Sequence, residues 1–460
     1  MSAAVATPIA TSDALRFQAA NAQGIKAVQA GTPGKAIAYY LEALEILRDP
    51  LVLDNLGDAY ARSGELDKAR AAFEEAISLK PDHAQAHYNL AVVHEQREDY
   101  EAARTCYRNS LACRVLPNAE NNLGNVEFWL VHLEAAEACY RSAVKHGYGD
   151  AIWNLSLCLL MQGKYREAWD WYDLRPQMVA MRGRERQWRG DVLHDKTLVI
   201  VTEQGLGDSI FMLRYIPLLR RQGARLKIVC DPGLRRIIQR QLHDDDPELP
   251  PAEVLDKTAT GTVAIPGDAF DYETLAMSIP GYVSPDGTGP NTPYLKAPTI
   301  PLAGGVKVGL CWNGSTAIGA PAERNIPLKA LAPLAEIPGV VLYSLQKGDG
   351  VDEIADCGFK IVDAMQGVTD VYDTATIIAS LDLVITIDTL IPHLAGALGK
   401  PTWLMNRFAS CWQWGTEKFD PKLYATVQQF RQPRRGDWAP VVEQVTAALR
   451  HLADVKAMDA

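Results

Sequence analysis

The segment Pro50–His83 reads PLVLDNLGDAYARSGELDKARAAFEEAISLKPDH, and it decides the fold of the first part of the chain. Two stretches with helical periodicity flank Gly64, a residue suited to a tight turn. The small residues Gly57 and Ala69 let two helices approach closely, and Phe73 lies one turn beyond Ala69 on the same helical face. The segment therefore predicts a helical hairpin whose apolar face must be buried by a neighbouring hairpin.

The same pattern recurs along the chain at an interval of about 33 residues. The aligned alanines are Ala36, Ala69, Ala103, Ala136 and Ala168, and the aromatic residues four positions later are Tyr40, Phe73, Tyr107, Tyr140 and Tyr172. This pattern resembles the tetratricopeptide repeat, and the resemblance implies an α-solenoid over residues 1–175. The solenoid is either a scaffold that dimerises or covers the rest of the chain, or a concave groove that binds an extended protein segment.

A different pattern begins at Thr197, where apolar strands alternate with helical stretches. The expected strands are Thr197–Thr202 and Leu226–Cys230, and the expected helices are Ser209–Arg221 and Gly233–Leu242. Strands that alternate with helices over short connections predict a parallel, Rossmann-like sheet.

A second α/β stretch begins at Val306, after the turn-rich segment Ser284–Pro301. Its expected strands are Val306–Trp312, Val340–Leu345, Leu383–Ile387 and Thr402–Met405, and its expected helices are Lys329–Ile337, Val371–Ala379, His393–Leu398 and Ala439–Leu452. The sequence thus predicts an α-solenoid at 1–175, a linker and first Rossmann-like lobe at 176–300, and a second lobe at 301–460.

Candidate site residues of the first lobe lie in the loop EQGLGDS, residues 203–209. Gly205 and Gly207 let the backbone approach a ligand, and the amides at a helix start attract anions. Asp208 has two interpretations: it caps the helix, or it acts as a general base that takes a proton from an attacking hydroxyl.

This loop, the following Arg214–Leu219 (RYIPLL) and the segment Asp388–Leu398 (DTLIPHLAGAL) resemble bacterial tetratricopeptide glycosyltransferases related to the heptosyltransferases. The resemblance implies a GT-B pair of Rossmann-like lobes, with the acceptor on the first lobe and a nucleotide sugar on the second. It implies inverting, metal-independent transfer to a hydroxyl, with Asp208 as the base. The repeats suggest a protein acceptor, such as flagellin or another surface protein, and the alternative acceptor is a lipopolysaccharide or another glycan.

In the second lobe, the resemblance points to a set of residues that contact the donor and its phosphates: Asn313, Ser315, Arg324, Gln346, Lys347, Asp388 and Thr389. Cationic side chains and helix-start amides would neutralise the charge on the departing phosphate. The alternative interpretation of Lys347 is that it is only a charge on the protein surface. His393 is either a catalytic hydrogen-bond donor or a hydrogen-bonded histidine at a helix start, and Trp412 and Trp414 either stack on the ligand or pack in the core.

Composition excludes several other classes. The net charge of −10 argues against a nucleic-acid binder, and eight cysteines without a Cys-x-x-Cys pair indicate free thiols. Asp244–Asp246 reads as an acidic turn rather than a metal motif, so we expect no metal and no cofactor beyond the nucleotide-sugar co-substrate. The absence of a signal or long apolar segment predicts a cytoplasmic protein.

The alternative to a glycosyltransferase is a non-catalytic tetratricopeptide scaffold with a degenerate nucleotide-sugar-binding module.

Overall fold

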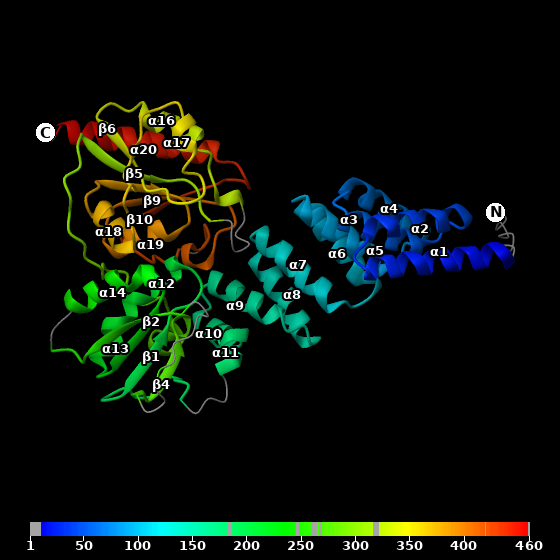
Figure 1. Ribbon diagram of the computed structural model, residues 1–460, viewed down its shortest axis with the longest axis horizontal. Coiled ribbons are helices and arrows are strands. Elements are labelled where there is room, and N and C mark those ends of the chain that lie inside the picture. The colour runs from blue at the N-terminus through cyan, green and yellow to red at the C-terminus, as the bar shows by residue number, and fades with distance from the viewer. Residues whose placement is uncertain are drawn as a thin grey trace. The chain divides into compact units, whose positions relative to one another are not determined.

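The computed structural model describes residues 11–181, 186–244, 248–258, 265, 269–315, 322–418 and 420–458. The chain divides into two compact units, Met1–Cys158 and Leu159–Ala460 (Figure 1).

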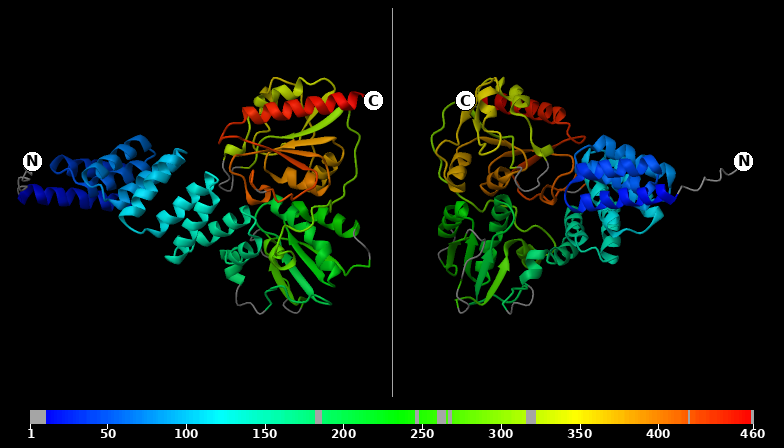
Figure 2. Two further views of the ribbon diagram at one scale, coloured as in Figure 1. Left: turned by 180° about the vertical axis from the view of Figure 1, so that it is seen from behind. Right: turned by 45° about the vertical axis from the view of Figure 1, so that its right-hand side comes forward.

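The first unit consists of helices that pack as consecutive pairs, and each pair packs on the next (Figure 2). The helices are α1 Thr11–Gln29, α2 Pro33–Ile46, α3 Pro50–Arg62, α4 Leu66–Leu79, α5 Ala84–Gln96, α6 Tyr100–Cys113, α7 Pro117–Trp129 and α8 Leu133–Lys145, followed by α9 Ala151–Met161. The predicted α-solenoid is confirmed for this part of the chain.

Small residues set the distance between the helices of each pair. Ala36, Ala69, Ala103 and Ala136 are fully buried. A Cβ atom on Gly57 of α3 would lie 2.5 Å from the ring of Phe73 in α4. The aromatic ring therefore fills the space that glycine leaves open, as the repeat pattern predicts.

The turns between paired helices require a left-handed backbone. Gly31 and Gly64 provide it with φ angles of 68° and 78°. At the equivalent positions of the next two pairs, Glu98 and Val131 adopt φ angles of 60° and 61°. Because a β-branched residue is sterically hindered in this region, the turn at Val131 is strained.

The second unit begins with α10 Tyr165–Tyr172 and α11 Pro176–Met181, followed by a four-stranded parallel sheet of order β3-β2-β1-β4. Its strands are β1 Thr197–Val201, β2 Arg225–Cys230, β3 Ala252–Asp256 and β4 Tyr272–Leu275, and its helices are α12 Leu206–Met212, α13 Ile216–Arg221, α14 Pro232–Asp244 and α15 Ile279–Val283.

The second sheet has six parallel strands in the order β10-β9-β8-β5-β6-β7, which is the doubly wound order of dinucleotide-binding folds. Its strands are β5 Val306–Cys311, β6 Val340–Ser344, β7 Val362–Asp363, β8 Leu383–Thr386, β9 Thr402–Asn406 and β10 Val427–Arg431. Helices α16 Ala332–Ala335 and α20 Ala439–Met458 lie on one face, and α18 Val371–Ala379 and α19 Leu390–Ala397 lie on the other (Figure 1). The short α17 Glu353–Asp356 precedes β7. The region thus has the parallel α/β content that the sequence predicts.

Prolines change the bounds of two predicted helices. The predicted helix Ser209–Arg221 is divided by a 3-10 turn at Leu213–Tyr215, because Pro217 has no N–H to donate to an earlier carbonyl. The predicted helix Lys329–Ile337 is a 3-10 turn at Leu328–Leu331 followed by one turn of α-helix, with Pro333 near its start.

A third helix begins earlier than predicted. Helix α19 starts at Leu390 rather than His393, because the Thr389 hydroxyl accepts a hydrogen bond from the Ile391 N–H at 3.2 Å and caps it.

The boundary between the units lies within α9, whereas the sequence places the end of the repeats at residue 175. Helix α10 carries the last aligned alanine, Ala168, but it packs against α15. Its Trp169 also lies edge-on to Trp412, with ring centroids 5.7 Å apart. Helix α10 is therefore part of the second unit.

Candidate functional site

Ligands of parallel sheets bind at the carboxyl ends of the strands where the strand order reverses. In the first sheet this point lies between β1 and β4, and in the second sheet between β5 and β8. The predicted loops 203–208, 312–315 and 387–389 follow β1, β5 and β8. Helices α12 and α19, which begin at two of these loops, pack against each other (Figure 1).

Gly207 lies where the two lobes approach each other closely. A Cβ atom there would lie 2.9 Å from Cδ2 of His393 and 3.5 Å from the carbonyl oxygen of Thr389. Any side chain at this position would separate α12 from α19, so glycine is required for the contact.

Asp208 has the capping role that the sequence allows and also faces the other lobe. Its Oδ2 accepts a hydrogen bond from the Gly205 N–H at 3.1 Å, and its Oδ1 accepts one from Gln413 Nε2 at 2.8 Å. Burial raises the pKa of the Asp208 carboxyl to about 6, and the negative charge of Asp388 adds to this effect. A carboxyl with this pKa is able to exchange protons near neutral pH.

Asp388 and Thr389 precede α19. The Asp388 Oδ1 accepts a hydrogen bond from the indole Nε1 of Trp414 at 2.7 Å. Trp414 is buried, and its ring lies against the imidazole of His393 at a centroid distance of 4.8 Å. Trp414 thus positions both Asp388 and His393 from the protein core.

His393 is buried within α19, one turn beyond the helix start. Its Nδ1 lies 3.0 Å from the hydroxyl oxygen of Tyr424. Burial lowers the pKa of His393 to about 4, although the charge of Asp388 opposes the shift. The imidazole is therefore neutral near pH 7.

Arg324 lies where the loops after β5 and β8 meet. Its Nη1 donates to the carbonyl oxygen of Asp388 at 3.4 Å, and its Nη2 donates to the carbonyl oxygen of Ser315. A Cβ atom on Gly314 would lie 2.7 Å from the guanidinium. The structure thus brings the Arg324 guanidinium to the backbones of Ser315 and Asp388.

Gln346 and Asn313 brace the loop after β5. Gln346 is buried, and its Oε1 accepts hydrogen bonds from the N–H groups of Trp312 at 3.1 Å and Asn313 at 3.0 Å. Its Nε2 donates to the carbonyl oxygens of Asn313 at 2.8 Å and Asp349 at 2.7 Å. Both N–H donors and both acceptor positions of the Gln346 side chain are therefore bonded to backbone groups. Gln346 stabilises the conformation of the loop after β5.

Lys347 is exposed, and its Nζ donates to the carbonyl oxygen of Val368 at 2.8 Å. No contact among the described residues connects it to Arg324, Asp388 or His393. Its position corresponds to the surface-charge alternative.

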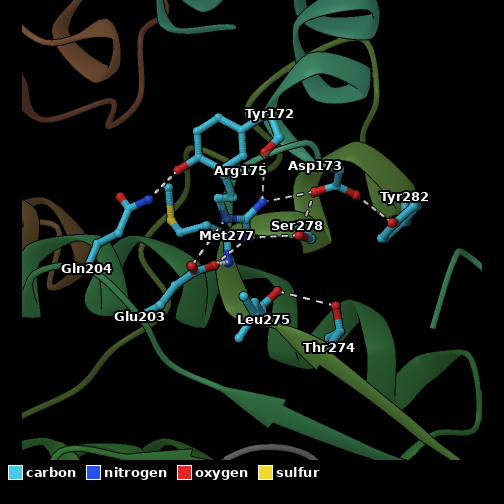
Figure 3. A network of polar contacts seen from close by, with 10 residues as sticks. All are labelled: Tyr172, Asp173, Arg175, Glu203, Gln204, Thr274, Leu275, Met277, Ser278 and Tyr282. Carbon is cyan, nitrogen blue, oxygen red and sulfur yellow. Dashed lines mark hydrogen bonds and ion pairs between the residues drawn. The ribbon is translucent and has the colours of Figure 1, made fainter. Parts of the chain in front are cut away.

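A buried polar network that the sequence did not indicate holds the loop before Asp208 (Figure 3). Arg175 donates from Nη2 to Glu203 Oε1 at 2.6 Å and from Nε to Oε2 at 3.2 Å. Glu203 also accepts from the Met277 N–H at 3.1 Å. Asp173 accepts from Ser278 Oγ at 2.6 Å. The network fastens the segment after α10, the loop after β1 and the residues after β4 to one another.

A cavity of about 470 Å³ lies beside this network and is lined in part by Trp169, Asp173 and Tyr282. None of the predicted site residues lines it.

The residues that the structure describes contain no group of three or more His, Cys, Asp or Glu side chains placed to hold a metal ion. Within the same ranges, no helix is both long and apolar enough to cross a bilayer. Of the acidic turn, Asp244 accepts from Arg240 Nε at 3.1 Å, and Asp245 and Asp246 lie outside the described residues.

Comparisons with known proteins agree with the helical part of this description. The tetratricopeptide repeat family model matches residues 55–113 and 130–177. The Photosystem I assembly protein Ycf3 of Acaryochloris marina is 32% identical over 120 residues, which cover 23% of this chain and 72% of that protein. The chain therefore belongs to the tetratricopeptide-repeat proteins.

A longer similarity is found with Protein FlbA of Caulobacter vibrioides. It is 26% identical over 460 residues, covering 90% of this chain and 70% of FlbA, so the similarity extends over both units. Among solved structures, MamA is 21% identical with a TM-score of 0.33, covering 35% of this chain and 96% of MamA.

Proposed function

We propose that the second unit is a GT-B glycosyltransferase that moves a sugar from a nucleotide sugar to an acceptor hydroxyl with inversion and without a metal. The observation that supports this proposal is that α12 and α19, which follow the strand-order reversals of the two sheets, pack against each other near their first residues. Asp208 comes from one sheet, and Arg324, Asp388 and His393 come from the other.

In the proposed reaction, the acceptor oxygen attacks the anomeric carbon of the sugar. The bond between that carbon and the phosphate oxygen breaks, and the nucleotide leaves with the electron pair. The Asp208 carboxylate takes the acceptor proton. Arg324 and the first amides of α19 stabilise the negative charge that develops on the phosphate.

The repeats support a protein acceptor. Three asparagines lie on the first helices of successive pairs and donate side-chain hydrogen bonds: Asn89 to Asp54, Asn122 to Tyr88 and Tyr107, and Asn154 to Asn121. All three are only partly buried. Amide side chains at the repeat spacing suit the regularly spaced carbonyl and N–H groups of an extended chain. Flagellin or another surface protein remains the acceptor that the family resemblance suggests.

A non-catalytic scaffold is the second candidate. It is favoured by the extent to which Asp208, Asp388 and Gln346 already bond to protein groups. In that case the second unit would bind a nucleotide sugar without turning it over, and the repeats would carry the function.

Both candidate functions require that the second unit binds a nucleotide. Calorimetric titration with UDP, GDP, ADP and CMP tests this requirement. We expect one nucleotide to bind wild-type protein and Arg324→Gln to weaken it about 10–100-fold, because a charge-assisted phosphate contact is lost. Lys347→Gln is the matched control and should change affinity by less than about threefold, since an exposed charge contributes little. Equal losses in both variants, or no binding of any nucleotide, would count against the site. Turnover of the nucleotide sugar then separates the enzyme from the scaffold.

A further inference from the structure

We propose that His393 donates a hydrogen bond through Nε2–H as a neutral imidazole, and that Tyr424 and Arg214 are positioning residues that hold it in this tautomer. The role toward a departing phosphate rests on the proposed function. The tautomer itself rests only on the contacts around the ring.

Tyr424 supplies the hydrogen bond at Nδ1. Its hydroxyl oxygen lies 3.0 Å from Nδ1 of His393 and 3.4 Å from the hydroxyl oxygen of Tyr294. Tyr294 donates its own proton to the carbonyl oxygen of Ile210 at 2.8 Å. The Tyr424 proton therefore has two acceptors, and Nδ1 is the nearer one. If Nδ1 accepts, the single proton of the neutral ring lies on Nε2.

Arg214 places a buried positive charge beside Tyr424, the residue bonded to Nδ1. Its guanidinium carbon lies 4.7 Å from the ring centroid of Tyr424 and 5.4 Å from that of Tyr294. Its Nη1 donates to the carbonyl oxygens of Pro290 and Leu423, each at 3.0 Å. No carboxylate among the described residues forms an ion pair with it.

The opposite edge of the ring faces the start of α12, next to Asp208. The Cδ2–Nε2 edge of His393 faces Gly207, which precedes Asp208, and a Cβ on Gly207 would lie 3.6 Å from Nε2. The charge of Asp388 favours a proton on the imidazole, and the charge of Arg214 opposes it. A proton on Nε2 is thus farther from the cation and nearer the acidic loop, which favours the Nε2–H tautomer.

Nε2 is also available to a ligand. No hydrogen bond to this atom is formed by any residue in the described ranges, whereas Nδ1 is bonded to Tyr424. The Trp414 ring covers one face of the imidazole and fixes its plane. Burial disfavours the protonated, charged form of His393. His393 is therefore a poor base. The two catalytic candidates therefore divide their roles: Asp208 accepts a proton, and His393 donates a hydrogen bond to an oxygen of the departing group.

Nitrogen NMR of the full chain, labelled with ¹⁵N in the histidine rings, tests the assignment. The protein has nine histidines, and His393→Gln identifies the signals of His393 by their loss. We expect a protonated Nε2 and an unprotonated, hydrogen-bonded Nδ1 near neutral pH. Tyr424→Phe removes the donor at Nδ1 and should give a mixture of tautomers.

Tyr294→Phe is the matched control, because it removes a neighbouring hydroxyl but leaves the contact between Tyr424 and His393 in place. It should preserve the wild-type ring signals. A protonated Nδ1 in the wild type, or unchanged signals in Tyr424→Phe, would overturn the assignment. If a nucleotide sugar is turned over, Tyr424→Phe should lower kcat about 10–100-fold with little change in KM. The expected tautomer without any turnover would uphold the assignment and count against the proposed function.

Discussion

Asp208 and Gln413 lie 205 positions apart in the sequence, in the first turn of α12 and in a 3-10 turn between β9 and β10, and are joined by a hydrogen bond of 2.8 Å from Gln413 Nε2 to Asp208 Oδ1. The bond holds one carboxylate oxygen of Asp208 toward the second lobe, while the other oxygen accepts from Gly205. The Gln413 hydrogen bond therefore affects the pH at which Asp208 ionises.

The proposed base must be deprotonated to act. Since the pKa of Asp208 is raised to about 6 by burial, kcat/KM should fall as the pH drops below about 6. The Gln413 hydrogen bond favours the charged carboxylate, so Gln413→Leu removes an effect that lowers the pKa. The acidic limb of the pH profile should then move upward by about one pH unit.

Gln222→Leu is a suitable control for this substitution, because Gln222 is exposed at the end of α13 and the described residues show no hydrogen bond from its side chain to Asp208 or Gln413. Its pH profile should match the wild type. An acidic limb that stays in place in Gln413→Leu would show that Asp208 does not set the pH dependence.

The turn at Val131 offers a stabilising substitution. Val131 holds a left-handed backbone, with φ of 61°, where the turn at Gly64 has glycine with φ of 78°. We expect Val131→Gly to raise the free energy of unfolding of the first unit by about 1 kcal/mol. The reverse change, Gly64→Val, should lower it by a similar amount. Urea unfolding followed by circular dichroism measures both, and a loss of stability in Val131→Gly would contradict the strain at this turn.

The buried pair of Arg175 and Glu203 should contribute strongly to the stability of the second unit. The two side chains are 1% and 10% exposed. Replacing one partner, in Arg175→Met or Glu203→Gln, leaves a buried group without its ion pair and should cost about 3–5 kcal/mol. The exposed pair of Arg166 and Asp286 is the matched control, and Arg166→Ala should cost less than about 1 kcal/mol. Equal losses in thermal or urea unfolding would refute the distinction.

Short-range patterns explain why the repeats could be predicted in detail. The contact of Gly57 with Phe73 spans one hairpin, and the spacing that creates it is visible in the sequence. The apolar central strands were also predicted. Strands β3, β4, β7 and β10 were missed, because all four are edge strands: β7 has only two residues, and the other three carry polar residues in the sequences AEVLD, YETL and VQQFR.

The site could be predicted only in part. Asp208 was proposed from its place between a strand and a helix, and Asp388 and Thr389 were proposed from the family resemblance; their roles stay predictions. The partners Gln413 and Tyr424 come from segments without regular periodicity, and no local pattern specifies their contacts with Asp208 and His393. The sequence also does not specify in which direction a long side chain points.

Lys347 and Gln346 illustrate that last point. Both follow β6 at the expected place, yet Lys347 bonds to Val368 and Gln346 turns back into the loop after β5. Their position on the chain was sufficient to nominate them, but tertiary packing decides where their polar atoms lie.

The most direct test of the account is turnover of a nucleotide sugar by the purified full chain, measured as nucleotide release with and without a protein acceptor. The account predicts release that depends on the acceptor and falls at least about 100-fold in Asp208→Asn, with nucleotide affinity retained. The exposed Asp286→Asn serves as the control and should retain wild-type turnover. Turnover in Asp208→Asn equal to that of the wild type, or no turnover of any nucleotide sugar that binds, would contradict the proposed reaction.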